Sequence, residues 1–247
     1  MWETILDNLL LSLILHLPFA LLAGLLRVVS VSGMLGGLVL GEFVFLALGW
    51  RGWLILIGFF VLGTLATKLG YREKEKRGLA QEKGGRRGAK HALANTICAT
   101  VLAVAAPFVA SFRPAAAPPL TLAFVGAFAT AVFDTGSSEL GQLYGHNPVL
   151  ITTFRRVEPG TPGAVSWQGT LGGLVLASLL GILAAGVGLV PWSVFWISPA
   201  AGLVGSSFES YLGAWLAEGK LSNELENFLN TLVGALSAFC LAWLMSP

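Results

Sequence analysis

Carboxylates and hydroxyl groups follow directly on an apolar stretch in the middle of this chain. Residues 120–133 are almost entirely apolar, and the run 134–139 then carries two carboxylates, Asp134 and Glu139, beside three hydroxyl groups. Ionisable groups in a membrane helix are costly and usually serve a function. Carboxylates are also the protein ligands that Mg²⁺ prefers. The run therefore predicts a metal or phosphate site at a helix end, with helix capping by Asp134 as the alternative.

An arginine pair lies further along, in the polar segment 151–163. Arg155 and Arg156 follow two threonines and precede a turn rich in glycine and proline, which also contains Thr161. Guanidinium groups bind phosphate oxygens in a bidentate manner. Acids that suit Mg²⁺ and arginines that suit phosphate together indicate phosphoryl chemistry at a membrane surface.

A second basic segment, 82–90, leads into an apolar stretch. Arg86 and Arg87 stand among glycines here, and Asn95 follows about one helical turn into the stretch. Free backbone N–H groups and the helix dipole make a helix N-terminus an anion site. We expect Arg86 and Arg87 to bind phosphate; the alternative is a solvated loop that only sets topology.

Polar residues recur in the last third of the chain. Ser207 and Glu209 interrupt an apolar stretch, and an intramembrane carboxylate such as Glu209 is a functional candidate unless it is only a hydrogen-bonded structural group. Asn227 and Asn230 share one face of a predicted helix with Asn223, where helix–helix hydrogen bonding is the alternative.

Thr170 lies in a glycine-rich run, 169–173, at the start of another apolar stretch. Glycines there allow a backbone to approach a phosphate closely. Close helix packing is the alternative for Gly172 and Gly173.

The composition identifies an integral membrane protein. Of 247 residues, 55% are hydrophobic and 11% are charged, against about 25% charged residues in soluble domains. We expect one domain over residues 1–247, because nearly all of it is needed for the membrane bundle. A net charge of +2 gives no reason to expect a nucleic-acid partner. Cys98 and Cys240 both fall in apolar stretches, so a structural disulfide is not expected.

The hydropathy pattern predicts an all-α polytopic bundle of about eight transmembrane helices. A span needs roughly 20 apolar residues. The segment 28–49 is interrupted by glycines and Glu42, so a re-entrant segment is the alternative there, and we treat Glu42 as structural. The predicted spans are 5–26, 28–49, 52–70, 92–111, 119–136, 169–190, 193–216 and 225–245.

The distribution of basic residues predicts the orientation. With eight spans and both termini outside, 13 of the 15 lysines and arginines face the cytoplasm, as the positive-inside rule requires. The basic loop 71–90 and the motif loop 137–166 then share the cytoplasmic face. The acidic N-terminus is not typical of a signal or transit peptide, which favours a prokaryotic plasma or internal membrane.

The run from Asp134 to Gly173 resembles a family of integral membrane proteins that includes phytyl-phosphate kinase and transmembrane protein 19. The resemblance rests on 134–141, 151–157 and 160–170, and it extends to 84–88, Asn95, 205–213 and Asn227. It covers most of residues 80–235, whereas the first 70 residues look like hydrophobic filler.

The resemblance implies a chemistry as well as a fold. The plant member phosphorylates phytyl phosphate to the diphosphate with a nucleoside triphosphate, in tocopherol and phylloquinone supply. The family is distantly similar to CTP-dependent lipid kinases and to phosphatidate cytidylyltransferase. Ser206, Asn227 and Asn230 stand where the last of these has aspartates, which favours phosphoryl over cytidylyl transfer.

We therefore predict a prenyl-phosphate kinase that uses CTP or a similar nucleotide. Mg²⁺ would be bound by Asp134, Glu139 and Glu209, and Arg155 and Arg156 would act with the acids in catalysis. The alternatives are a polyprenol kinase, a cytidylyltransferase or a lipid-phosphate transporter. The expected partners are an isoprenyl phosphate lipid, a nucleoside triphosphate and membrane lipids. The residues expected to bind phosphate or nucleotide are Arg86, Arg87, Asn95, Thr161, Thr170, Ser207, Asn227 and Asn230.

Overall fold

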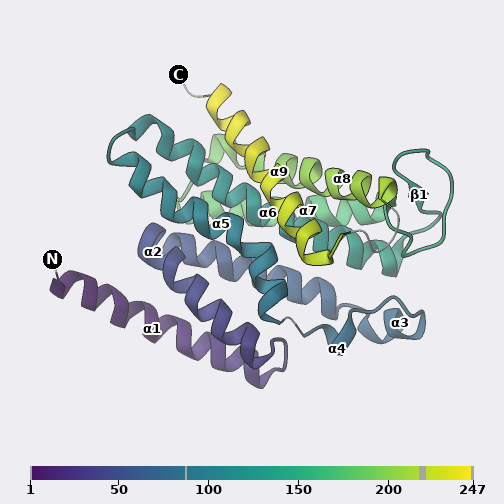
Figure 1. The fold of residues 1–247 in the computed structure, drawn as a ribbon, viewed down its shortest axis with the longest axis horizontal. Helices are drawn as coiled ribbons and strands as arrows, with labels where there is room; N and C mark the ends of the chain where they lie inside the picture. Colours follow the sequence, from purple (N-terminus) through teal and green to yellow (C-terminus); the bar gives the residue numbers. More distant parts are fainter. Residues whose placement is uncertain (1, 87, 217–220, 246–247) are drawn as a thin grey trace.

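The computed structural model describes residues 2–86, 88–216 and 221–245, and most of them lie in long helices. This architecture confirms the predicted all-α membrane bundle (Figure 1). The long helices are α1 (Trp2–Leu25), α2 (Val31–Lys68), α5 (Ala89–Ala110), α6 (Ala117–Tyr144), α7 (Trp167–Gly186), α8 (Ile197–Trp215) and α9 (Asn223–Leu244). Short elements join them: α3 (Tyr71–Lys76), α4 (Glu82–Gly85), the 3₁₀ turns Pro114–Ala116 and Trp192–Val194, and the strands β1 (Val149–Leu150) and β2 (Ala164–Val165).

Helix α2 is broken at Gly49 into two arms that fold back on one another. Gly49 has φ 66° and ψ −166°, a conformation outside the helical region that glycine adopts readily. A Cβ atom added at Gly41 in the first arm would lie 3.5 Å from the Leu56 side chain in the second. The two arms correspond to the predicted spans 28–49 and 52–70.

The helical arms match the eight predicted spans in order, although not all of them are equally apolar. Within the described part of the chain, five helices are long and apolar enough to cross a membrane, with α2 counted once. The apolar part of α1, residues 10–25, is shorter. Helix α8 carries Ser206, Ser207 and Glu209, which lower its hydropathy.

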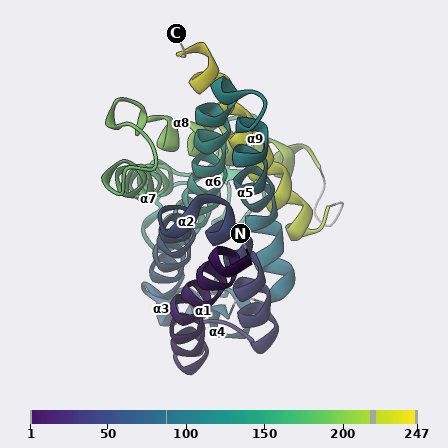
Figure 2. The same ribbon diagram turned by 90° about the vertical axis from the view of Figure 1, so that its left-hand side faces the viewer.

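Helix α6 is the central element of the bundle (Figure 2). It packs against α5, α7, α8, α9 and the second arm of α2, whereas α1 packs mainly against α2. All side chains from Leu122 to Phe133 are buried, so this segment is enclosed by protein on every side. Small residues alternate with phenylalanines there, and the small ones allow close helix contact in lipid.

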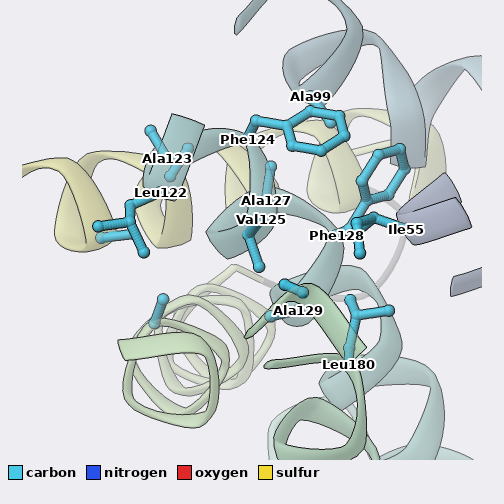
Figure 3. Close-up of a cluster of buried hydrophobic side chains, with 14 of the residues drawn as sticks. Ile55, Ala99, Leu122, Ala123, Phe124, Val125, Ala127, Phe128, Ala129 and Leu180 are labelled. Carbon is cyan, nitrogen blue, oxygen red and sulfur yellow. The ribbon is translucent and has the colours of Figure 1, made fainter. Parts of the chain in front are cut away.

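The core surrounds two phenylalanines of α6 (Figure 3). The Phe128 ring lies 5.2 Å from that of Phe124 and 5.1 Å from that of Phe59 on α2. Ile55, Ala99 and Leu180 bring α2, α5 and α7 to the same cluster. Since lipid tails are as apolar as these side chains, packing contacts rather than the hydrophobic effect hold the helices together.

The connecting loops that carry polar motifs lie at one end of the bundle, on the right in Figure 1. Helices α3 and α4 and the β1–β2 loop lie there, whereas the first turn of α1 and the last turn of α9 lie toward the other end. Strands β1 and β2 pair antiparallel, with Val149 opposite Val165. The bundle therefore gathers the motif loops at one end, as the predicted topology requires.

Two predicted boundaries were wrong. Helix α6 continues to Tyr144, so Asp134 lies within a helix, and the capping alternative fails. The basic segment 71–90 is not a plain loop, because α3 and α4 form inside it. Helix α6 extends beyond the apolar span where it packs against α7 and α3.

Candidate functional site

A polar cleft opens between α5, α6, α8 and α9 at the loop end of the bundle. It has two chambers of about 450 and 960 Å³. The smaller, loop-side chamber is lined by the segment 159–166 and by α7 and α8, and the larger, basic-side chamber by α4, α5 and α9. The chambers share Asp134, Ser138, Gln142, Glu209 and Asn223.

Two carboxyl groups lie together where the chambers meet. Asp134 on α6 and Glu209 on α8 lie close enough to interact directly. The Ser206 hydroxyl donates a hydrogen bond of 3.3 Å to Asp134, and the Asn230 amide of α9 donates one to Glu209. Three helices thus fix this pair, which lies within the bundle yet lines both chambers.

The geometry of this pair fits a magnesium ion. Two adjacent carboxylates repel unless a cation or proton lies between them. Mg²⁺ is usually bound by one or two protein carboxylates, with substrate phosphates and water completing the coordination. No group of three His, Cys, Asp or Glu side chains suited to a metal occurs among the described residues. Asp134 and Glu209 therefore offer a site that suits Mg²⁺ only together with a phosphate ligand.

Glu139 has a different partner from the one expected. Its carboxylate accepts a hydrogen bond of 2.5 Å from the Lys74 ammonium group of α3, and each residue is 1% exposed. Lys74 also donates to the carbonyl groups of Ala66 and Thr67, at 3.3 and 3.0 Å. The second Glu139 oxygen, Oε1, is buried without a hydrogen-bond partner among the described residues, and Glu139 lines the basic-side chamber. The structure thus separates Glu139 from the other two acids expected to hold metal.

The N-terminus of α5 faces the basic-side chamber. Gly88 is its N-cap residue and supplies no side-chain cap, and Gly88, Ala89 and Lys90 all line the chamber. Arg86 lines the same wall and is exposed. An uncapped helix N-terminus beside a guanidinium group attracts anions. Arg87, which we expected to share this role, lies outside the described residues.

Several other predicted site residues line the cleft. Thr161, Thr170 and Ser207 line the loop-side chamber. Asn227 lines the basic-side chamber, and its amide donates to the Asn223 carbonyl at 2.8 Å. Asn230 contacts the cleft only through its bond to Glu209.

Asn95 is placed differently from these residues. It is buried, its amide donates to the His91 carbonyl at 2.9 Å, and it lines an apolar pocket beside the cleft. Asn95 therefore lines this neighbouring pocket and not the cleft that contains the carboxylate pair.

The arginine pair of the motif loop does not line either chamber. Arg155 and Arg156 are exposed, and they follow Phe154, which has φ 54°. Their backbone instead closes the loop: Leu150 N–H donates to the Arg155 carbonyl at 2.9 Å. The structure therefore does not bring these guanidinium groups to the acids, and their proposed catalytic role stays a prediction.

The glycines that begin α7 serve close packing. A Cβ atom at Gly172 would lie 2.4 Å from the Leu140 side chain, and one at Gly173 would lie 2.6 Å from that of Phe133. A Cβ atom at Gly163, where φ is 77°, would clash with the Ser210 carbonyl at 2.6 Å. These glycines bring α7 and the motif loop against α6 and α8, and so form the walls of the loop-side chamber.

Some residues at this end of the bundle could not be identified from the sequence. Lys74 lines neither chamber, but it is buried against Glu139, and nothing in the sequence marks it as buried. Gln142 and Glu226 line the cleft. The position of Glu226, four residues before Asn230 on the same helix face, was a signal that could have identified it.

Comparison with known proteins bears out the resemblance. Residues 14–236 match the family described as integral membrane protein DUF92. The chain is 38% identical over 203 residues to an uncharacterized membrane protein of Synechocystis, sll0875, covering 80% of this chain and 76% of that protein. It is 33% identical over 248 residues to protein VTE6, chloroplastic, of Arabidopsis thaliana, covering 96% and 71%.

A relative from an archaeon extends the comparison. The uncharacterized membrane protein MJ0933 of Methanocaldococcus jannaschii is 31% identical over 229 residues, covering 91% of this chain and 90% of that protein. No solved structure matches this chain.

Proposed function

Because the chain belongs to the integral membrane protein DUF92 family, and because its cleft joins paired acids to an anion-binding helix end, we propose that it is a lipid-phosphate kinase. The proposed reaction transfers the terminal phosphoryl group of a nucleoside triphosphate, CTP or a similar nucleotide, to a prenyl monophosphate such as phytyl phosphate. The single observation that carries the proposal is the contact between Asp134 and Glu209 in a cleft also lined by Arg86 and the α5 N-terminus.

The bond changes of the proposed reaction are simple. An oxygen of the lipid monophosphate attacks the terminal phosphorus, the bond from that phosphorus to the bridging oxygen breaks, and the nucleoside diphosphate leaves with the electron pair. The acceptor oxygen is already anionic near neutral pH, since the second pKa of a phosphate monoester is about 6. No protein base is therefore needed, and we assign no proton transfer to His91, the histidine that lines the basic-side chamber.

The residues of the cleft have distinct parts in this proposal. Asp134 and Glu209 would hold Mg²⁺, which neutralises charge on the transferring phosphoryl group when bound. Arg86 and the free N–H groups of α5 would hold phosphate oxygens in the basic-side chamber. Ser206 and Asn230 orient the two acids through their hydrogen bonds. Thr161, Thr170 and Ser207 offer hydroxyl groups to the nucleotide from the loop-side chamber.

The orientation in the membrane is part of the proposal. Nucleoside triphosphates are cytoplasmic substrates, so the cleft would face the cytoplasm. The excess of basic residues in the loops at that end supports this orientation.

A product analysis tests the proposed function. Purified protein is incubated with phytyl phosphate, Mg²⁺ and each of the four common nucleoside triphosphates, and the lipid and nucleotide products are identified by mass. A lipid diphosphate with a nucleoside diphosphate is expected. A nucleotidyl lipid with pyrophosphate would instead establish cytidylyl transfer, and lipid movement across vesicles without nucleotide use would establish a transporter.

The matched control is a carboxylate outside the cleft. Asp134→Asn should lower product formation roughly a thousandfold, whereas Glu158→Gln, at an exposed position of the motif loop, should not change it. Equal turnover in both variants would contradict the site assignment.

A further inference from the structure

A narrow apolar pocket lies beside the basic-side chamber, between the N-terminal helices and α5. Its walls come from α1, both arms of α2 and the first two turns of α5, and they are almost wholly apolar. We propose that this pocket binds the single hydrocarbon chain of the lipid phosphate whose head group enters the cleft. The inference rests on the proposed function and names how its substrate is held.

The pocket and the cleft adjoin along two helices. His91 of α5 lines both of them. On α2, Ser32 lines the chamber and the next residue, Gly33, lines the pocket. A ligand that runs from the α5 N-terminus into the pocket must therefore be anionic at one end and apolar along the rest, as a lipid phosphate is.

The shape of the pocket suits one chain. It follows α2 from Gly33 to Leu40, a distance of roughly 10 Å at the rise of an α-helix. Its volume is about 100 Å³. A pocket of this size suits part of one hydrocarbon chain better than the paired chains of a phospholipid.

His16, which lines the pocket, is held in place by contacts with α2. The ring of His16 lies 5.3 Å from that of Trp53, and its Nδ1 atom lies 3.3 Å from a carboxylate oxygen of Glu42. Glu42 in turn accepts hydrogen bonds of 2.6 and 2.7 Å from the Ser12 hydroxyl. Glu42 thus contacts His16, which lines the pocket, within a region whose sequence looks like hydrophobic filler.

Gly37 offers a way to fill the pocket without disturbing the backbone. It lines the pocket, and a Cβ atom added there would meet no other atom within 4 Å. Gly37→Leu should therefore occupy the space meant for the chain. Val39→Leu is the matched control, because Val39 is on the same arm, is 58% exposed and does not line the pocket.

A photoaffinity experiment tests the inference without relying on turnover. Phytyl phosphate carrying a diazirine on its chain is irradiated with the full-length protein in nanodiscs, and labelled peptides are mapped by mass spectrometry. Labels are expected in the segments 16–23, 53–60 and 91–96. Gly37→Leu should lower this labelling at least fivefold, and Val39→Leu should leave it unchanged. Unlabelled phytyl phosphate should compete, and phosphatidic acid, with its two chains, should not.

Turnover of a short acceptor separates this inference from the proposed function. Isopentenyl phosphate has no long chain that would enter the pocket. The Gly37→Leu variant and the wild type should therefore phosphorylate it at the same rate. Labels spread equally over lipid-facing positions, or equal competition by phosphatidic acid, would overturn the pocket assignment while leaving a kinase intact. If phytyl phosphate neither labels the protein nor is converted, both the pocket assignment and the proposed function are wrong.

Discussion

Replacing Lys74 by methionine should destabilise the protein strongly, although Lys74 lies in a segment that resembles a surface loop. Methionine keeps most of the volume of lysine but removes its charge and its three hydrogen bonds. Glu139 would then be left buried without a counter-charge, at 1% exposure and with one of its oxygens already unpartnered. Removing one partner of a buried ion pair costs roughly 3–5 kcal/mol, because the remaining charge is uncompensated.

That loss of free energy corresponds to a measurable fall in the melting temperature. For a chain of this length, each kcal/mol lowers the melting temperature by roughly 2–4 °C, so Lys74→Met should lower it by roughly 10 °C. The assay is thermal unfolding followed by tryptophan fluorescence in a fixed detergent. Lys76→Met is the control, since Lys76 is an exposed lysine on the same short helix, and it should leave the melting temperature within about 2 °C of wild type.

A double variant distinguishes the ion pair from a metal role for Glu139. Replacing both partners by apolar residues, as Lys74→Met with Glu139→Leu, should recover most of the lost stability, because no buried charge remains. We expect this variant to retain measurable turnover, since Glu139 is paired with Lys74. An unchanged melting temperature in Lys74→Met alone would refute the buried pair, and a stable but inactive double variant would restore Glu139 to the metal site.

Three further predictions concern the cleft and its orientation. Asp134→Asn should lower kcat roughly a thousandfold while the protein still folds, because it removes charge compensation worth several kcal/mol; normal turnover at saturating Mg²⁺ would contradict the metal assignment. Arg86→Ala should raise the KM for the nucleotide or lipid phosphate more than Arg156→Ala does, because only the first side chain lines the cleft; steady-state kinetics would show the reverse if the motif loop carries the phosphate site. Cysteines introduced at Ala80 and Glu158 should be labelled by an impermeant maleimide from the same side of the membrane, and labelling from opposite sides would disprove the shared face.

The helical arms and their convergence could be predicted from the sequence. Apolar length fixes where helices cross the membrane, and the alternation of direction then places Asp134, Glu209 and Asn227 at one end. The contact between Asp134 and Glu209 follows from that topology once α6 and α8 are neighbours. The break at Gly49 could also be predicted from the sequence, since a glycine between two apolar runs suggests a turn.

Other parts of the site depend on packing that no local pattern records. Lys74 is surrounded by charged residues in the sequence, and only the docking of α3 on α6 buries it. Asp134 was expected at a helix end because apolar residues stop there, yet α6 continues to Tyr144 through contacts with α3 and α7. Arg155 and Arg156 have the composition of a phosphate site, but the turn at Phe154 leaves both exposed. Residue types thus predicted the chemistry of the cleft better than they predicted which residues line it.

The ion pair between Lys74 and Glu139 also constrains the order in which the chain assembles. The two residues are 65 positions apart, and synthesis proceeds at about 5–20 residues per second, so Lys74 precedes its partner by roughly 3–13 s. During that interval Glu139 is absent, and we expect the Lys74 ammonium group to stay hydrated outside the bilayer. We therefore expect helix α3 to dock fully only after α6 has been inserted, so that this buried ion pair forms late in biogenesis.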